Sequence, residues 1–207
     1  MMKATTGIHP THCGNLPNNW KDQLKKLHDN TNSISVGETG LDYYRSTNPD
    51  RKTQLEVFEE QVKFSIDMNK PLFLHLRPGD SCKQIINDFK QVVSNSNITG
   101  VVHCYTGDKE LLEHILSLNL YVGMTGYITE KRGEHLKELI KIIPKNKLLI
   151  ETDAPYLTPR NVKNLPRRNV PANMKYIMKY ISELIGITIT ELDIITEKNT
   201  LNLFNWE

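Results

Sequence analysis

The chain has 207 residues, of which 38% are hydrophobic and 24% charged, a composition typical of a globular domain with its own core. A formal net charge of +2 gives no overall attraction to nucleic acid or to a membrane surface. No apolar run is long enough to span a membrane, and the three cysteines lack the spacing of a disulfide framework. We therefore expect a single domain over residues 1–207, without a membrane partner, in a cytoplasmic or nuclear location.

Short apolar segments alternate with longer amphipathic stretches along the chain. We expect strands at residues 3–10, 33–42, 71–77, 100–107, 120–127 and 147–155. We expect helices between them, at residues 17–29, 50–69, 80–93, 108–118 and 131–143. Beyond the last strand, the sequence predicts a proline-containing loop at residues 156–173. Two helices are expected within residues 171–205. This alternation predicts an α/β fold with a parallel sheet.

Four of the predicted strands run into an ionisable residue. Glu38 closes "SISVGE", His75 closes "PLFLH", His103 closes "GVVH" and Asp153 closes "LLIETD". The carboxyl ends of parallel strands share one edge of a sheet, and this edge is where α/β proteins place their sites. Two histidines and two carboxylates form a ligand set for Zn²⁺, Mn²⁺ or Fe, and an acceptable one for Mg²⁺. The pattern therefore predicts a divalent-metal site.

Other residues near these strand ends have either a site role or a structural one. His9 follows the first strand and is either a ligand, a support for a ligand, or a structural residue. Asp42 and Arg77 come just after their strands and either orient a ligand or bind substrate, or serve in loops and at the surface. Glu151, two residues before Asp153, is expected in a buried hydrogen bond or ion pair.

The long loop is rich in cations. These cations either bind phosphate groups of a substrate or form an ordinary solvated surface. They are Arg160, Lys163, Arg167 and Arg168. His28, His114 and His135 lie in helical stretches, and we expect them to be solvated.

Seven short motifs occur in order along the chain: "GIHP", "GETGLDYYR", "PLFLHLR", "VVHCYTG", "GMTGY", "LLIETDAPYLTPR" and "RRNVPAN". In order and rough spacing, they resemble the TatD family of metal-dependent deoxyribonucleases over essentially the whole chain. The resemblance implies a TIM-type (β/α) barrel of the amidohydrolase kind and hydrolysis of DNA. It also implies one or two divalent ions (Mg²⁺, Mn²⁺ or Zn²⁺) held by Glu38, His75, His103 and Asp153.

The sequence departs from the family pattern at its start. The family usually opens with an HxH pair on the first barrel strand, and this pair is not found here. We therefore expect an incomplete barrel with about six of eight strand–helix units. Since the HxH pair would serve the second ion, we also expect one firm and one weak metal site.

The expected activity is hydrolysis of DNA phosphodiester bonds by a metal-activated water. Glu38 and Asp153 are the expected catalytic residues, Glu38 by bridging two ions and Asp153 as a ligand or as the base that accepts the proton of water. Two alternatives stay open. One is an amidohydrolase that acts on an amide or ester of a small molecule, and the other is an inactive metal-binding remnant.

Overall fold

The structure is a computed structural model that describes residues 2–94 and 96–206. Six β-strands alternate with helices in these residues, in agreement with the predicted α/β class and strand number. The chain divides into two compact units, one up to Val102 and one from His103 onward. None of the helices described is both long and apolar enough to cross a membrane.

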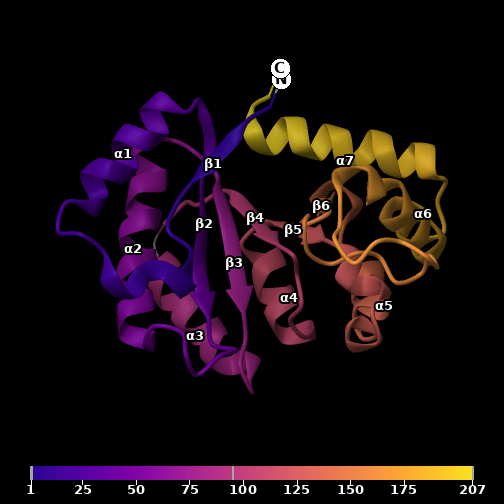
Figure 1. Ribbon diagram of the computed structural model, residues 1–207, viewed down its shortest axis with the longest axis horizontal. Helices are drawn as coiled ribbons and strands as arrows, with labels where there is room; N and C mark the ends of the chain where they lie inside the picture. The colour runs from indigo at the N-terminus through magenta and orange to yellow at the C-terminus, as the bar shows by residue number, and fades with distance from the viewer. Residues whose placement is uncertain (1, 95, 207) are drawn as a thin grey trace. The chain divides into compact units, whose positions relative to one another are not determined.

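The first unit is built on parallel strands that follow one another in chain order, with helices packed beside them (Figure 1). β1 pairs with β2, and β2 pairs with β3, each in parallel. The elements are β1 (Ala4–Thr6), the 3₁₀ turn η1 (Pro10–Asn15), α1 (Trp20–Asn30), β2 (Ser33–Asp42), α2 (Arg51–Asp67), β3 (Leu72–Arg77), α3 (Cys82–Val93) and β4 (Gly100–His103), whose last residue opens the second unit.

Local sequence accounts for these elements. Leu72, Leu74 and Leu76 of β3 are buried and the residues between them are half-buried, as period-two alternation requires. The Asp50 side chain caps α2 by accepting a hydrogen bond from the Thr53 amide at 3.0 Å. Phe58 of α2 stacks on Phe89 of α3, with ring centroids 6.0 Å apart, so the helices share an aromatic core contact.

The second unit contains two parallel strands, β5 and β6, and the C-terminal helices. Asn199 of α7 fastens the last helix to β6, because its amide group donates to the carbonyls of Lys145 and Leu148, each at 2.8 Å. The elements are α4 (Lys109–Ser117), β5 (Tyr121–Met124), η2 (Gly126–Thr129), η3 (Lys131–Gly133), α5 (Leu136–Leu139), η4 (Ile140–Ile142), η5 (Lys145–Lys147), β6 (Leu148–Ile150), η6 (Pro171–Asn173), α6 (Met174–Ile185) and α7 (Ile189–Phe204).

The predicted helix at residues 131–143 is wrong as a single element. In the structure this stretch is broken into short 3₁₀ turns around the four-residue α5. Gly133 and the β-branched Ile140, Ile142 and Ile143 are weak helix formers, which accounts for the break. The loop predicted at residues 156–173 is confirmed, apart from the short turn η6 at its end.

The prediction that His28 is solvated is also wrong. His28 lies in the last turn of α1, four residues after the buried Leu24, and it is 4% exposed. Its ring meets the edge of Phe64, with centroids 5.5 Å apart, and Nδ1 has no hydrogen-bond partner among the described residues. Burial, and secondarily the charge of Lys70, lowers the pKa of His28.

The buried His28 should make the protein less stable in acid. The unfolded chain binds a proton at this ring near pH 6.5, whereas the folded chain binds it only at lower pH. The stabilising contribution is therefore present above pH 6.5 and is lost as the pH falls below this value, by at most about 1.4 kcal/mol per pH unit. Urea unfolding in EDTA at about pH 7.5 and about pH 5.5 should show a larger loss of stability for the wild type than for H28L. Equal losses would contradict the assignment.

Candidate metal centre

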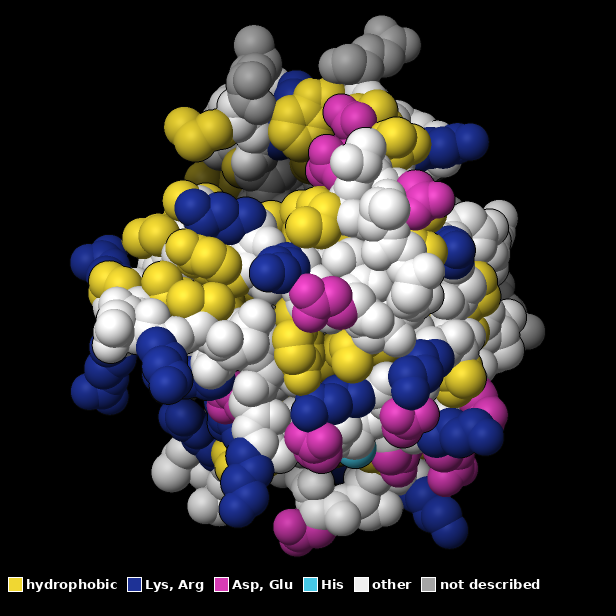
Figure 2. All heavy atoms as spheres, turned by 90° about the vertical axis from the view of Figure 1, so that its right-hand side faces the viewer, with side chains coloured by type: hydrophobic (Ala, Val, Ile, Leu, Met, Phe, Trp, Pro, Cys, Tyr) yellow, Lys and Arg dark blue, Asp and Glu magenta, His cyan; other side chains and the backbone are white. Residues whose placement is uncertain are grey.

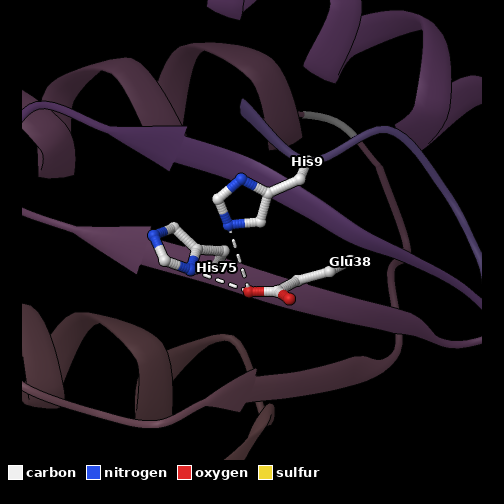
Figure 3. A group of neighbouring side chains, drawn as sticks. All are labelled: His9, Glu38 and His75. Carbon is white, nitrogen blue, oxygen red and sulfur yellow. Dashed lines mark hydrogen bonds and ion pairs between the residues drawn. The ribbon is translucent and has the colours of Figure 1, made fainter. Parts of the chain in front are cut away.

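Three side chains that can bind a metal ion lie together in the first unit (Figure 3). His9 follows β1, Glu38 belongs to β2 and His75 to β3. Glu38 Oε1 lies 2.8 Å from His75 Nδ1 and 3.4 Å from His9 Nε2. The two rings meet edge to face, with centroids 4.4 Å apart, and one ligand atom of each residue lies within 4.8 Å of the others. All three side chains are half-buried, so a site here is reachable from solvent.

The sequence places Glu38 at the end of a strand segment, but in the structure Glu38 lies inside β2. β2 continues for four residues beyond it to Asp42. Its pairing with β3 shifts register between Gly37 and Thr39, so the strand is irregular at the glutamate. A Cβ atom on Gly37 would overlap the carbonyl oxygen of Phe73, so glycine lets the two strands approach closely here. Such an irregularity re-aims a side chain, and here it accompanies a Glu38 that faces both imidazoles.

Thr11 holds the His9 ring. His9 precedes the turn η1, and its Nδ1 lies 2.6 Å from the Thr11 hydroxyl and 3.2 Å from the Thr11 amide nitrogen. Because Nδ1 is engaged by Thr11, the ring turns Nε2 toward Glu38. In metal sites, a hydrogen bond at one ring nitrogen fixes the orientation of the other, and Thr11 is placed to do this for His9.

Asp42 supports His75 from the other side of its ring. Asp42 is 3% exposed, and its Oδ2 lies 3.0 Å from His75 Nε2. Burial would raise the pKa of Asp42, but hydrogen bonds from His75 and the Tyr44 amide outweigh it, so the pKa is lowered. The charged carboxylate can therefore hold a proton on Nε2 and leave Nδ1 to face Glu38. This is the carboxylate–histidine arrangement that supports metal ligands, and it gives Asp42 the orienting role.

His103 has a carboxylate partner of the same kind in the second unit. Its Nδ1 lies 2.9 Å from Glu151 Oε2, and the other oxygen of Glu151 accepts from the Cys104 amide at 2.8 Å. A Cβ atom on Gly123 would overlap Glu151 Oε1, so the glycine leaves room for the carboxylate. Glu151 thus takes part in a hydrogen bond and an ion pair, as predicted, but its side chain is half-buried and not buried. Because Nδ1 is engaged, any metal bond from His103 would use Nε2.

Asp153 lies three residues beyond β6 in a left-handed backbone conformation with φ of 51°, which aspartate tolerates better than most residues. Its carbonyl accepts from the Tyr156 amide at 2.8 Å, closing a turn into the long loop. Burial raises the pKa of the Cys104 thiol to about 12, and the charges of Glu151 and Asp153 act in the same direction. His103, Glu151 and Asp153 therefore lie near one half-buried thiol, which is protonated at neutral pH.

Arg77 and Arg160, which were expected to orient a ligand or to bind substrate, make their described contacts with residues outside the group of His9, Glu38 and His75. The Arg77 guanidinium lies over the ring of Tyr44, 3.8 Å from its centroid. Arg160 is exposed on the long loop, and its amide nitrogen donates to the Thr129 hydroxyl at 2.7 Å. Neither is a metal ligand, because a guanidinium stays protonated and offers only donors.

The donor set of the first unit fits a divalent ion. Two neutral imidazoles and one carboxylate suit Zn²⁺, Mn²⁺ or Fe, and each histidine has a hydrogen-bonding partner that orients it. The sequence left His9 between a ligand role and a structural one, and the structure places its Nε2 within ligand distance of the group. Thr11 was not identified from the sequence as a supporting residue, because a threonine two residues after a histidine is not a recognisable pattern.

Comparison with known proteins identifies relatives along the whole chain. The family model for the TatD related DNase matches residues 1–205. A protein of Erwinia tasmaniensis named 3'-5' ssDNA/RNA exonuclease TatD is 34% identical over 205 residues, which cover 98% of this chain and 78% of the relative. An uncharacterized metal-dependent hydrolase of Bacillus subtilis, YabD, is 32% identical and covers 97% of this chain and 76% of the relative.

Solved structures agree with these matches. The crystal structure of a TatD family hydrolase from Entamoeba histolytica has a TM-score of 0.85 and 27% sequence identity, and it covers 99% of this chain and 75% of that one. The YJJV structure, a TatD homolog from Escherichia coli, has a TM-score of 0.84 and 26% identity. The predicted barrel-type fold, with six of the strand–helix units, is confirmed by this similarity. The chain therefore belongs to the TatD family of metal-dependent hydrolases.

Proposed function

We propose that this protein is a metal-dependent deoxyribonuclease that hydrolyses phosphodiester bonds. The observation that carries the proposal is the group of His9, Glu38 and His75, whose ligand atoms are close enough to share one ion. The matched family model is described as a TatD related DNase, and one relative is named as an exonuclease of single-stranded DNA and RNA, which supports a nucleic acid substrate.

We assign the first ion to Glu38, His75 and His9. His103 and Asp153 are proposed as the further ligands. Their support is their place at or just after the carboxyl ends of β4 and β6, together with the carboxylate that orients His103. Mg²⁺, Mn²⁺ and Zn²⁺ are the candidate ions, since nitrogen and oxygen donors accept all three to different degrees.

The chemistry divides between the ion and the side chains. A bound divalent ion lowers the pKa of water to about 7 and offsets charge on the phosphoryl oxygens. Asp153 serves either as a further ligand or as the base that accepts the proton of the attacking water, and the second role requires that its carboxylate lie within hydrogen-bond reach of that water. Glu38 faces both imidazoles and supplies negative charge to the ligand set. Asp42 and Thr11 keep the imidazoles oriented through the reaction.

Chelation is the direct test. Purified protein treated with EDTA should not cleave a labelled single-stranded oligonucleotide, and adding back Mg²⁺, Mn²⁺ or Zn²⁺ should restore cleavage, because the nucleophile depends on the ion. The same samples should be assayed on a small-molecule amide and a carboxylic ester. Hydrolysis of only the amide or ester would replace the proposal with an amidohydrolase. Metal binding without any turnover would replace it with an inactive metal-binding protein.

The basic loop should contribute electrostatic affinity for the substrate. Its cations are all exposed: Arg160, Lys163, Arg167 and Arg168. Figure 2 shows Lys and Arg side chains on both sides of one face of the protein, with few acidic side chains among those at the lower left and many among those at the lower right. Near its end the loop is anchored by the buried Asn169, whose amide group donates to the Thr152 carbonyl at 2.9 Å. Because the loop is already anchored to the rest of the unit, less of its conformational freedom is lost when its arginines bind a nucleic acid strand.

We expect R160A to weaken DNA binding in a salt-dependent manner. If about three phosphates are bound, the log–log slope of affinity against salt is roughly −2 for a single strand, and loss of one arginine reduces it by roughly 0.7 to 1. K198A is the matched control, since Lys198 is an exposed cation on α7. Anisotropy titrations at several salt concentrations measure the slopes. Identical slopes for wild type, R160A, R167A and R168A would exclude the loop as a DNA-binding element.

A further inference from the structure

An exposed tyrosine and an arginine are stacked at the carboxyl ends of β2 and β3. Tyr44 is 58% exposed, although aromatic rings usually bury most of their surface. The Arg77 guanidinium lies 3.8 Å from the centroid of its ring, at a distance typical of close cation–π stacking. Neither residue belongs to the group of His9, Glu38 and His75. A stacked pair of this kind is of functional interest only because of its position beside that group.

The position of this pair is fixed by the same residues that support the metal ligands. The Tyr44 amide donates to Asp42 Oδ1 at 3.0 Å, while Asp42 Oδ2 faces His75. The Asn48 amide group donates to both the carbonyl and Oδ1 of Asp42, at 3.1 and 2.9 Å, and closes the loop that carries Tyr44. The loop therefore rests on one buried carboxylate that also holds a ligand.

Backbone contacts extend the strand pairing past the end of the sheet. The Tyr43 amide donates to the Arg77 carbonyl at 2.9 Å, directly before Tyr44. A Cβ atom on Gly79 would lie 2.5 Å from the Tyr43 carbonyl oxygen, so the two loops are in close contact. The segments that carry the tyrosine and the arginine are thus held against each other beyond the strand ends.

Arg77 and His75 project from the same face of β3. The strand alternates between buried and half-buried residues, and both of these belong to the half-buried set. Two residues along a strand rise by about 7 Å, so the Cα atom of Arg77 lies about one nucleotide unit beyond that of His75, toward the carboxyl end of β3. A polymer with one phosphodiester at His75 is therefore long enough to place the neighbouring unit near Arg77.

We propose that Tyr44 and Arg77 form a nucleotide platform, on which a base of a single-stranded substrate stacks against Tyr44 while Arg77 binds a phosphate next to the scissile one. The proposal rests on the function proposed above. Every base has a π-face, so stacking binds single strands without demanding a sequence, and an arginine beside an aromatic ring adds charge and planarity. A paired base could not stack here, so the platform selects single strands.

The chain supplies a matched control for the stacked pair. Lys147 lies over the ring of Tyr121, 4.4 Å from its centroid, and Tyr121 is the first residue of β5. This pair also joins a cation to a tyrosine, but the Tyr121 ring is half-buried and stands at the amino end of its strand. Sites in parallel sheets lie at the carboxyl ends, so the Tyr121 pair should not contact substrate.

The test compares oligothymidylate with an oligomer of the same length whose sugars carry no bases. Fluorescence anisotropy in EDTA gives the affinity of wild type, Y44L, Y44F, R77A and Y121L for both probes, and cleavage assays with metal give KM and kcat. Wild type, Y44F and Y121L should prefer the base-bearing probe by roughly tenfold, the size expected for one stacked base. Y44L should lose this preference and raise KM for oligothymidylate by a similar factor. R77A should weaken binding of both probes.

Each outcome decides a separate question. If Y44L keeps the full preference for bases, the platform is wrong, whatever the catalytic result. An equal loss of affinity for both probes in Y44L leaves the preference for bases unchanged, so it also counts against the platform. If the wild type cleaves no oligonucleotide with any added metal, the proposed nuclease function fails, while the binding titrations in EDTA still accept or reject the platform.

Discussion

Replacing Glu38 with glutamine should remove most of the metal affinity and lower DNA turnover by at least about 100-fold. The Oε1 atom of Glu38 faces both His9 and His75, so it is the one acceptor common to the ligand group. E38Q keeps the shape of the side chain but removes its negative charge, and an amide is a far weaker ligand than a carboxylate. Metal content after dialysis and the rate of oligonucleotide cleavage at saturating metal measure the two effects.

The matched control is E60Q. Glu60 forms ion pairs with Lys21 and Lys63 at the surface of the first unit, so its substitution removes the same charge without touching the site. E60Q should keep wild-type metal content and turnover. Full metal occupancy in E38Q, with an unchanged rate, would show that His9, Glu38 and His75 are a hydrogen-bonded group and not a ligand set.

Replacing Asp153 with asparagine should lower kcat by roughly 100-fold, the factor commonly lost with a general base, and should change KM little. The side chains are nearly the same size, but an amide cannot accept the proton of water at neutral pH. Single-turnover cleavage of a labelled oligonucleotide gives the rate, and metal analysis of the same sample separates two roles. A slow enzyme with normal metal content supports a base, whereas a slow enzyme with less metal supports a ligand.

D193N serves as the control for this change. Asp193 is exposed on α7, and its substitution should leave both rate and metal content unaltered. The left-handed backbone at Asp153 is compatible with asparagine, which tolerates that conformation well, so D153N should also keep the melting temperature of the wild type. Cleavage by D153N at the wild-type rate would remove Asp153 from the chemistry.

The fold was predictable because alternating strand and helix patterns are repeated along the whole chain. Each strand predicted from its apolar residues is present, and the β2 bounds, Ser33–Asp42, agree at both ends. What failed was the helix at residues 131–143, where weak helix formers gave an amphipathic pattern without the propensity to sustain a long helix. Periodicity reports which side of an element is buried, but it does not report whether the element is continuous.

The direction of individual side chains was harder to predict. Period-two alternation ceases to apply at a register shift, which is where Glu38 lies, and at residues with positive φ such as Cys104 and Asp153. A signal did exist for His28, because it follows the buried Leu24 by four residues and so shares its helix face. Thr11, in the turn η1, and Asn48, in a loop, both support the site, but neither belongs to a periodic pattern that could reveal it.

Gly123 has a consequence for how this sequence tolerates change. It carries no functional group, yet the space above its Cα atom is taken by the Glu151 carboxylate that orients His103. Even alanine would have to displace that carboxylate, and the imidazole with it. In a mutational scan scored by activity, position 123 should therefore be as restricted as a catalytic position, while a scan scored by protein abundance should register a much smaller penalty. Disagreement between the two scores at a glycine would identify a residue whose contribution to function is the volume it leaves empty.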